Sequence, residues 1–339
     1  MKNWIRSASL AAAALALVTA AHAAGTVGNT LPADFPVIED TSLGKPVIGF
    51  GAAGAVARTP VIFLHGNNDT PFPTACGVFG HMQVMAQFLA DNGYATSELW
   101  GLGYQGDQCD LVTVGQTRRS SIAHTNAANV PDLRRFVRAV LAYTGAKEVD
   151  IVAHSLGVTL AREWIRQDQA GHQVRRFVAI DGPNQGIINC SPSPLNYFQA
   201  AAAGGFTPQS EVCAELGSPN TPFLKLLNRD DDDRGWRGRG HGGRDGRDEV
   251  RTLVIRNADK SFVFFPLQDG LIAPVPAEDS FGKPFDFSKS AQIKGATQLD
   301  LVGQGIYDTI LGTTHLGILN SPQTRQATLD FLTARPRRH

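Results

Sequence analysis

A short apolar segment that passes directly into a helical pattern is the feature that most constrains the fold of this chain. Residues 148–153 have the composition of a buried strand, and residues 156–167 have the apolar spacing of an amphipathic helix. Only the dipeptide His154-Ser155 separates the two patterns. A strand that runs straight into a helix is the first part of a βαβ unit, and such units build parallel sheets.

The chain from residue 60 onward repeats this alternation of strand and helix patterns. Apolar β-type runs predict further strands at 60–64, 94–99, 176–180, 253–255 and 299–302. Helical spacing predicts helices at 81–91, 131–143 and 321–332, the second opening with Pro131 in its first turn. We therefore expect an α/β fold, with a mostly parallel central sheet covered by helices on both faces.

The turn between the strand at 148–153 and the following helix has the pattern of a nucleophile elbow. In such an elbow, a sharp strand-to-helix turn lifts a serine hydroxyl above the sheet, and here that residue is Ser155. Ala153 and Gly157 supply the small side chains that let strand and helix approach closely. An isolated S-x-G is common by chance, but the strand before it and the helix after it favour Ser155 as a nucleophile.

Two further segments fit the same chemistry. His65-Gly66-Asn67 follows the first strong strand, where this arrangement places half of an oxyanion hole, so we expect the backbone N–H groups of Asn67 and Leu156 to be the donors. His315 lies in a loop after the last strand and before the final helix, which is the expected place for the general base. His65 and His154 are expected to have packing roles, although His315 could also be structural.

The acid that would orient His315 is ambiguous in the sequence. Asp259 follows the strand pattern at 253–255 almost at once. Asp269 begins an acid-Gly-apolar-apolar turn followed by Pro274, a frequent setting for a triad acid. We favour Asp269 over Asp259 and leave the choice open. The acid would hold the imidazole in the correct tautomer and stabilise the imidazolium.

The amino-terminal residues have the pattern of a signal peptide. Lys2 and Arg6 precede an apolar stretch at 10–18, and Ala21-His22-Ala23 ends it, so we expect residues 1–23 to be removed. The apolar run is shorter than a membrane anchor needs, and no later segment is long and apolar enough to span a bilayer. We therefore expect a secreted or periplasmic protein without stable membrane insertion.

Four cysteines remain in the exported part of the chain. Sequence order favours Cys76–Cys109 and Cys190–Cys213, with the other two connectivities open. The cysteines and histidines do not form the close pairs of a zinc site, and we expect neither a metal nor an organic cofactor. The formal net charge is +0, which gives no support for nucleic-acid binding.

Residues 24–339 are expected to form a single domain with an inserted cap-like region at 187–249. Within that region, residues 229–249 are rich in glycine and in both charge signs, which predicts a mobile loop. A calcium site at Asp230 to Asp233 is a weaker alternative, because neighbouring arginines already balance the charge.

At these motifs the chain resembles the bacterial extracellular lipases of the α/β-hydrolase superfamily. The likeness is strongest to minimal secreted triacylglycerol lipases, through the A-H-S-x-G elbow at 153–157 and the ending His315-Leu316-Gly317-Ile318-Leu319. It is strong over residues 58–181 and looser over 250–332, and the chain has extra length at 68–126 and 187–249. Some secreted polyhydroxyalkanoate depolymerases are similar at the same elbow.

The resemblance implies a serine hydrolase that cleaves carboxylic esters, with Ser155, an aspartate and His315 as its triad. The substrate would be a lipid ester or, alternatively, an insoluble polyester. A peptidase or amidase is a further possibility, and an inactive hydrolase fold used for binding is the non-enzyme alternative, which would normally lack one triad residue. The sequence does not predict an oligomeric state.

Overall fold

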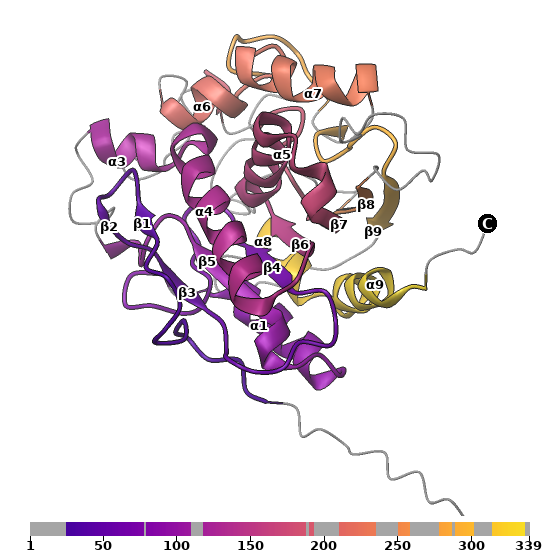
Figure 1. The fold of residues 1–339 in the computed structure, drawn as a ribbon. Helices are drawn as coiled ribbons and strands as arrows, with labels where there is room; N and C mark the ends of the chain where they lie inside the picture. Colours follow the sequence, from indigo (N-terminus) through magenta and orange to yellow (C-terminus); the bar gives the residue numbers. More distant parts are fainter. Residues whose placement is uncertain are drawn as a thin grey trace, which may run out of the picture.

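The computed structural model describes residues 25–77, 79–109, 118–187, 190–192, 210–234, 250–257, 278–286, 289–301 and 314–335. The expected signal peptide at 1–23 lies outside these residues. A central sheet runs through the described part, with helices packed around it (Figure 1).

Seven strands form this sheet in the spatial order β3-β5-β4-β6-β7-β8-β9. Their bounds are β3 Ile48–Phe50, β4 Val61–Leu64, β5 Leu99–Gly103, β6 Val149–His154, β7 Val174–Ile180, β8 Arg251–Asn257 and β9 Thr297–Leu301. Only β3 is antiparallel to its neighbour, β5. The mostly parallel sheet confirms the predicted α/β fold. Strands β1 (Glu39–Asp40) and β2 (Lys45–Pro46) form a separate small hairpin.

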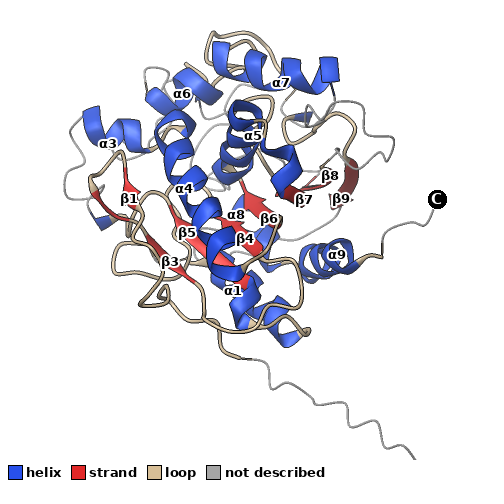
Figure 2. Cartoon of the chain, viewed as in Figure 1, coloured by secondary structure: helices blue, strands red, loops and turns tan. Residues whose placement is uncertain are grey.

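Helices cover both faces of the sheet (Figures 1 and 2). They are α1 His81–Asp91, α3 Arg118–Ala123, α4 Asn126–Thr144, α5 Leu156–Asp168, α6 Glu211–Leu216, α7 Pro222–Arg234, α8 Thr314–Gly317 and α9 Pro322–Thr333. Short 3₁₀ turns lie at η1 Thr96–Glu98, η2 Ala170–Gln173 and η7 Ile318–Asn320. Helices α4 and α5 lie side by side over one face, while α1 packs against α9 (Figure 1).

The two faces are specified by alternation along the strands, because successive strand side chains point to opposite sides of a sheet. Ile62, Leu64 and Ile151 belong to one buried cluster, together with the apolar residues of α4 and α5. Val61 and Val152, their direct neighbours in sequence, belong to the other cluster, with residues of α1 and α9. Burial on both faces explains why these strands are apolar at nearly every position.

Two predicted elements are displaced along the chain. The strand predicted at 94–99 begins at Leu99 instead, after the 3₁₀ turn η1. The buried Glu98 carboxylate causes this difference, since it accepts the backbone N–H groups of Ala57, Arg58 and Ala95 at 2.7, 2.6 and 2.9 Å. These bonds hold residues 95–98 in a turn that the apolar composition does not reveal.

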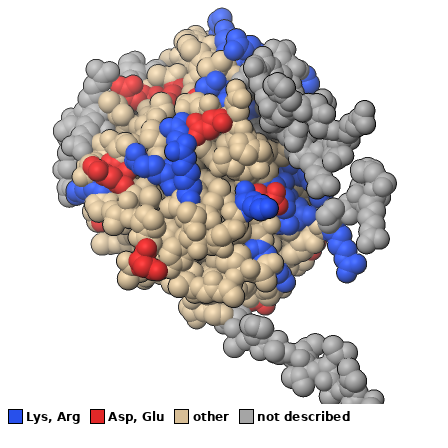
Figure 3. Space-filling view, viewed as in Figure 1, with Lys and Arg blue, Asp and Glu red and all other residues tan. Residues whose placement is uncertain are grey.

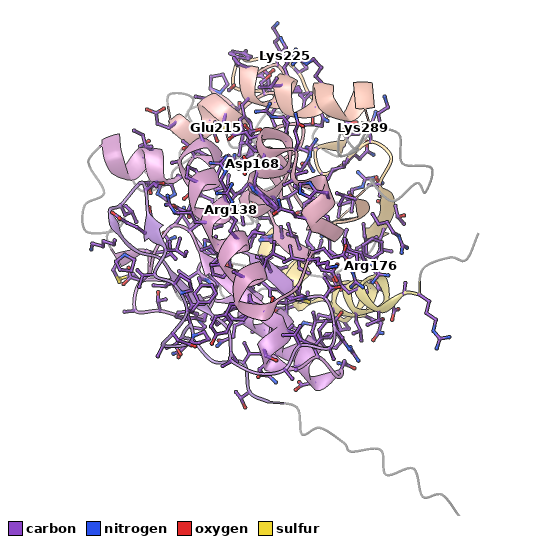
Figure 4. All side chains as sticks on the ribbon, viewed as in Figure 1. Arg138, Asp168, Arg176, Glu215, Lys225 and Lys289 are labelled. Carbon is purple, nitrogen blue, oxygen red and sulfur yellow. A yellow bond between two sulfur atoms is a disulfide. The ribbon has the colours of Figure 1, made fainter. Side chains whose placement is uncertain are left out.

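Helix α4 begins at Asn126, so the prediction that Pro131 opens this helix was wrong. Thr125 caps the helix by accepting the N–H of Ala128 at 3.2 Å. Glu215 of α6, labelled in Figure 4, accepts the N–H groups of Asn126 and Ala127 at 2.6 and 3.0 Å. Burial raises the pKa of the Glu215 carboxyl to about 7. A partner some ninety residues away, which no local pattern reveals, thus supports the first turn.

The expected cap region contains α6 and α7, which lie together at the top of the molecule in Figure 1. Helix α7 continues to Arg234 and so enters the segment expected to be a loop from residue 229; residues 235–249 lie outside the described part. The buried Arg162 of α5 donates to the side chain of Asn184 at 2.7 Å and to that of Asn228 on α7 at 3.0 Å. These bonds join α7 to α5 and to the segment that follows β7.

Both favoured disulfides are present, Cys76–Cys109 and Cys190–Cys213, which confirms the pairing expected from sequence order. The second bridge ties α6 to the segment that follows β7. None of the helices in the described ranges is long and apolar enough to cross a membrane. Basic and acidic side chains are interspersed over the face in view, in keeping with the formal net charge of +0 (Figure 3).

Candidate active site

Ser155 lies at the sharp turn between β6 and α5, at the carboxyl edge of the parallel strands. Its backbone has φ 52° and ψ −124°, a conformation that costs energy in any residue with a side chain. The Ser155 N–H donates to the carbonyl of Ile180, the last residue of β7, at 3.0 Å. A strained serine between a strand and a helix is the geometry of a nucleophile elbow.

The loop after β4 packs directly against this elbow. A side chain on Gly66 would have its Cβ only 3.0 Å from the Cβ of Ser155, and one on Gly157 would meet the carbonyl oxygens of His65 and Leu64 at 2.6 and 2.7 Å. Glycine at both positions therefore permits the contact between the two loops. The segment at 65–67 lies where the sequence predicted an oxyanion loop, with Asn67 partly exposed and Leu156 opening α5.

Gly157→Ala is expected to disturb both stability and activity. The added methyl group would clash with two backbone carbonyls, so the loop after β4 must move and unfolding should become easier by about 1–3 kcal/mol. Thermal denaturation and ester-hydrolysis rates would measure the effect. Gly28→Ala is the matched control, since a Cβ at Gly28 meets no atom within 4 Å. A Gly157→Ala variant as stable and active as the wild type would contradict the close packing.

His65 is held by contacts within this loop. Its ring stacks on the Tyr104 ring, with centroids 4.2 Å apart, and its carbonyl accepts the Tyr104 hydroxyl at 2.5 Å. Burial lowers the pKa of His65, so the ring is neutral near pH 7. These contacts give His65 the packing role that the sequence favoured for it.

His315 lies on α8, and its backbone is fixed to the elbow through His154. The Nε2–H group of His154 donates to the carbonyl of His315 at 2.8 Å, and the two ring centroids are 4.5 Å apart. Burial and the neighbouring His315 hold the pKa of His154 well below its usual value, so His154 is neutral and can donate from Nε2. His315 therefore lies beside the residue that precedes Ser155.

The carboxylate that contacts His315 is Asp181, which directly follows β7. Its Oδ2 lies 2.7 Å from His315 Nδ1, and both side chains are almost fully buried, at 1% and 4% exposed. A carboxylate accepts at this position, so Nδ1 of the neutral ring carries the proton and Nε2 is left as the basic nitrogen. This is the tautomer that a general base for a serine requires.

The structure thus brings together Ser155, His315 and the loop at 65–67 among the predicted site residues. Asp269 and its alternative Asp259 lie outside the described residues. Asp181 was not among the acids predicted from the sequence. A usable signal existed in the sequence, because Asp181 follows an apolar strand without any spacer. The carboxyl ends of parallel strands share one edge of the sheet, where active-site groups gather.

Within the described ranges, no group of three or more His, Cys, Asp or Glu side chains is arranged to hold a metal ion. The side chains of Asp230 to Asp233, the weaker calcium alternative, are not among the described side chains, although their backbone belongs to α7. The described site offers a serine hydroxyl, a buried imidazole–carboxylate pair and a glycine-containing loop. Together these groups can perform nucleophilic acyl transfer.

Comparison with known proteins gives a family match over much of the chain. The sequence model of one family, described as Lipase (class 2), matches residues 58–237. The mature form of lipase BlEst2 from Bacillus licheniformis is similar in structure, with 15% identity, 84% of this chain and 95% of that chain covered, and a TM-score of 0.46.

Two further solved structures are similar at comparable levels. Lipase B from Aspergillus fumigatus has 14% identity and a TM-score of 0.47, covering 91% of this chain and 56% of that chain. A hormone-sensitive lipase from a metagenome library has 16% identity and a TM-score of 0.47, covering 91% of this chain and 86% of that chain.

Proposed function

The chain belongs to the class 2 lipase family, whose sequence model matches more than half of it, and we propose that it is an exported esterase or lipase acting through Ser155, His315 and Asp181. As a member of this family it is a carboxylic ester hydrolase of the α/β-hydrolase fold. One observation supports the proposal: His154, the residue directly before the strained Ser155, is hydrogen-bonded to the backbone of His315, whose ring is hydrogen-bonded to the buried Asp181.

The proposed reaction follows from the roles of these groups. His315 Nε2 takes the proton of the Ser155 hydroxyl, and Oγ attacks the carbonyl carbon of the ester. The backbone N–H groups of Asn67 and Leu156 stabilise the oxyanion of the tetrahedral intermediate. His315 then protonates the departing alcohol, and a water molecule activated by His315 hydrolyses the acyl-enzyme.

Asp181 has two tasks in this scheme. It keeps the proton of the neutral His315 ring on Nδ1, and its negative charge stabilises the imidazolium that forms at each proton transfer. The hydrogen bond of His154 to the His315 carbonyl supports the placement of the ring. We propose Asp181 as the triad acid in place of Asp269.

Export is the second part of the proposal. The pattern of residues 1–23 and the two disulfides support a secreted or periplasmic location, since disulfides persist in oxidising compartments. Because the extra chain at 68–126 and 187–249 distinguishes this protein from minimal lipases, we keep both lipid esters and polyesters as candidate substrates.

A substrate panel with the purified mature protein tests the proposed activity. We expect hydrolysis of p-nitrophenyl butyrate and palmitate and release of fatty acid from a triglyceride emulsion, with Ser155→Ala as the negative control. Clearing of a polyhydroxyalkanoate suspension without fatty-acid release would instead assign the protein a depolymerase activity that uses the same residues. An absence of hydrolysis across the whole panel would contradict the proposed function.

A further inference from the structure

A network of side-chain amides behind the loop at 65–67 ends on a buried histidine, His124. The network starts at Gln108, passes through Gln105 and Asn67, and reaches the ring of His124, whose Nδ1 lies 2.6 Å from Asn67 Oδ1. Gln105 and Gln108 follow β5, and His124 lies between α3 and α4. Gln105, Gln108 and His124 fall in the extra length at 68–126, which begins directly after Asn67.

Two backbone groups fix the orientation of the two glutamine amides. Asn68 N–H can only donate, and it meets Gln105 Oε1 at 3.3 Å, while the Asp69 carbonyl can only accept and meets Gln108 Nε2 at 3.1 Å. Gln105 therefore presents its NH₂ group to Asn67 Oδ1, at 3.2 Å. The Asn67 oxygen must accept, so His124 Nδ1 must donate.

The state of His124 agrees with this assignment. Its ring is fully buried, and burial lowers its pKa to about 4, so it is neutral over the range in which an ester hydrolase works. A neutral imidazole carries one proton, and Nδ1 is the nitrogen with an acceptor. His124 Nε2 has no hydrogen-bond partner among the described residues. In a buried site, a nitrogen lone pair without a partner costs less free energy than an N–H group without an acceptor, so the proton belongs on Nδ1.

The loop at 65–67, which this network contacts, leads into a strained backbone position. Asn68, directly after Asn67, has φ 59°, in the left-handed region that residues with a side chain rarely adopt. Oxyanion donors are effective when they are already aimed before the charge develops. The Cys76–Cys109 disulfide closes the same part of the chain, next to Gln108.

We infer that His124 is a positioning residue, which donates from Nδ1 to the Asn67 side chain and thereby holds the Asn67 backbone N–H in place for the oxyanion. This inference rests on the proposed function for its consequence in catalysis. The hydrogen-bond network itself is independent of any reaction. Both parts can therefore be measured separately.

A matched pair of substitutions tests the role of the donor. Asparagine and leucine have nearly the same shape, but only asparagine keeps an N–H donor near the position of Nδ1. We expect His124→Leu to lower kcat about 10- to 100-fold, with KM within about twofold of the wild type, because an interaction with the transition state is lost. His124→Asn should recover most of the loss. His172→Leu, at an exposed histidine, is the control and should be unchanged.

The Asn67→Ala background tests whether His124 acts through the Asn67 side chain. Alanine keeps the backbone N–H but removes the acceptor, so adding His124→Leu should then cause little further loss of kcat. Equal losses in both backgrounds, a loss confined to KM, or a His124→Asn variant as slow as His124→Leu would each overturn the inference. So would an unchanged kcat in His124→Leu.

Nitrogen NMR of histidine-labelled wild-type protein supplies a readout that requires neither activity nor a folded His124 variant. We expect the His124 ring to be neutral at pH 7 with the proton on Nδ1, and its Nδ1–H signal to shift in Asn67→Ala. A proton on Nε2 would overturn the inference. If the NMR result is as expected but the wild-type protein hydrolyses no ester, the proposed function has failed while the network stands.

Discussion

Ser155→Ala is expected to lower kcat/KM for p-nitrophenyl butyrate by about four to six orders of magnitude, because it removes the oxygen that we propose as the nucleophile. The residual rate over water should come from the oxyanion donors and from substrate binding. The fold should persist, since alanine keeps the Cβ that packs against Gly66 and makes the backbone at φ 52° no more strained than serine does.

The matched control for this substitution is Ser97→Ala. Ser97 is also buried, but it lies in η1, just before β5, where its hydroxyl donates to the carbonyl of Ala55 at 2.6 Å. We expect this variant to lose some thermal stability and to keep the activity of the folded enzyme. A Ser155→Ala variant with more than a few per cent of wild-type turnover would contradict the nucleophile assignment.

Asp181→Asn is expected to lower kcat about a thousand- to ten-thousand-fold with little change in fold. An asparagine amide can donate to His315 Nδ1, which would move the ring proton to Nε2 and remove the basic nitrogen that the proposed mechanism requires. The loss of charge also leaves the imidazolium unstabilised in the buried site. Kinetics on p-nitrophenyl butyrate and circular dichroism would measure the two effects.

Asp259→Asn and Asp269→Asn are the comparison variants for this prediction. Both aspartates were candidates from the sequence, and Asp259 follows β8, the strand that pairs directly with β7. We expect each of these variants to retain most of the wild-type kcat. If one of them carries the large loss and Asp181→Asn does not, then the triad acid is that residue and the assignment of Asp181 is wrong.

Local patterns predicted the elements that surround the elbow well. The apolar run before Ser155 and the helix after it correspond to β6 and α5, and the helix predicted at 81–91 is α1. These elements bury residues with a regular period on the sheet faces, so their sequences carry the signal directly. The favoured disulfides were also predictable, because each one joins cysteines that are neighbours in sequence order.

Features that depend on distant partners were not predictable from the chain alone. The first turn of α4 depends on Glu215, the start of β5 on the contacts of Glu98, and the orientation of Asn67 on His124. Asp181 was missed because the expected order placed the acid after a later strand. In each case the deciding contact joins residues that are about forty or more positions apart in the sequence.

The most direct test of the central claim is covalent labelling with a p-nitrophenyl alkylphosphonate, which reacts with a serine activated by a neighbouring base. Mass spectrometry of the digested protein would locate the adduct. We predict stoichiometric phosphonylation of Ser155 with loss of all esterase activity, and no labelling of Ser155→Ala at any other residue. An adduct on a different residue, or esterase activity that survives full labelling of Ser155, would contradict the account.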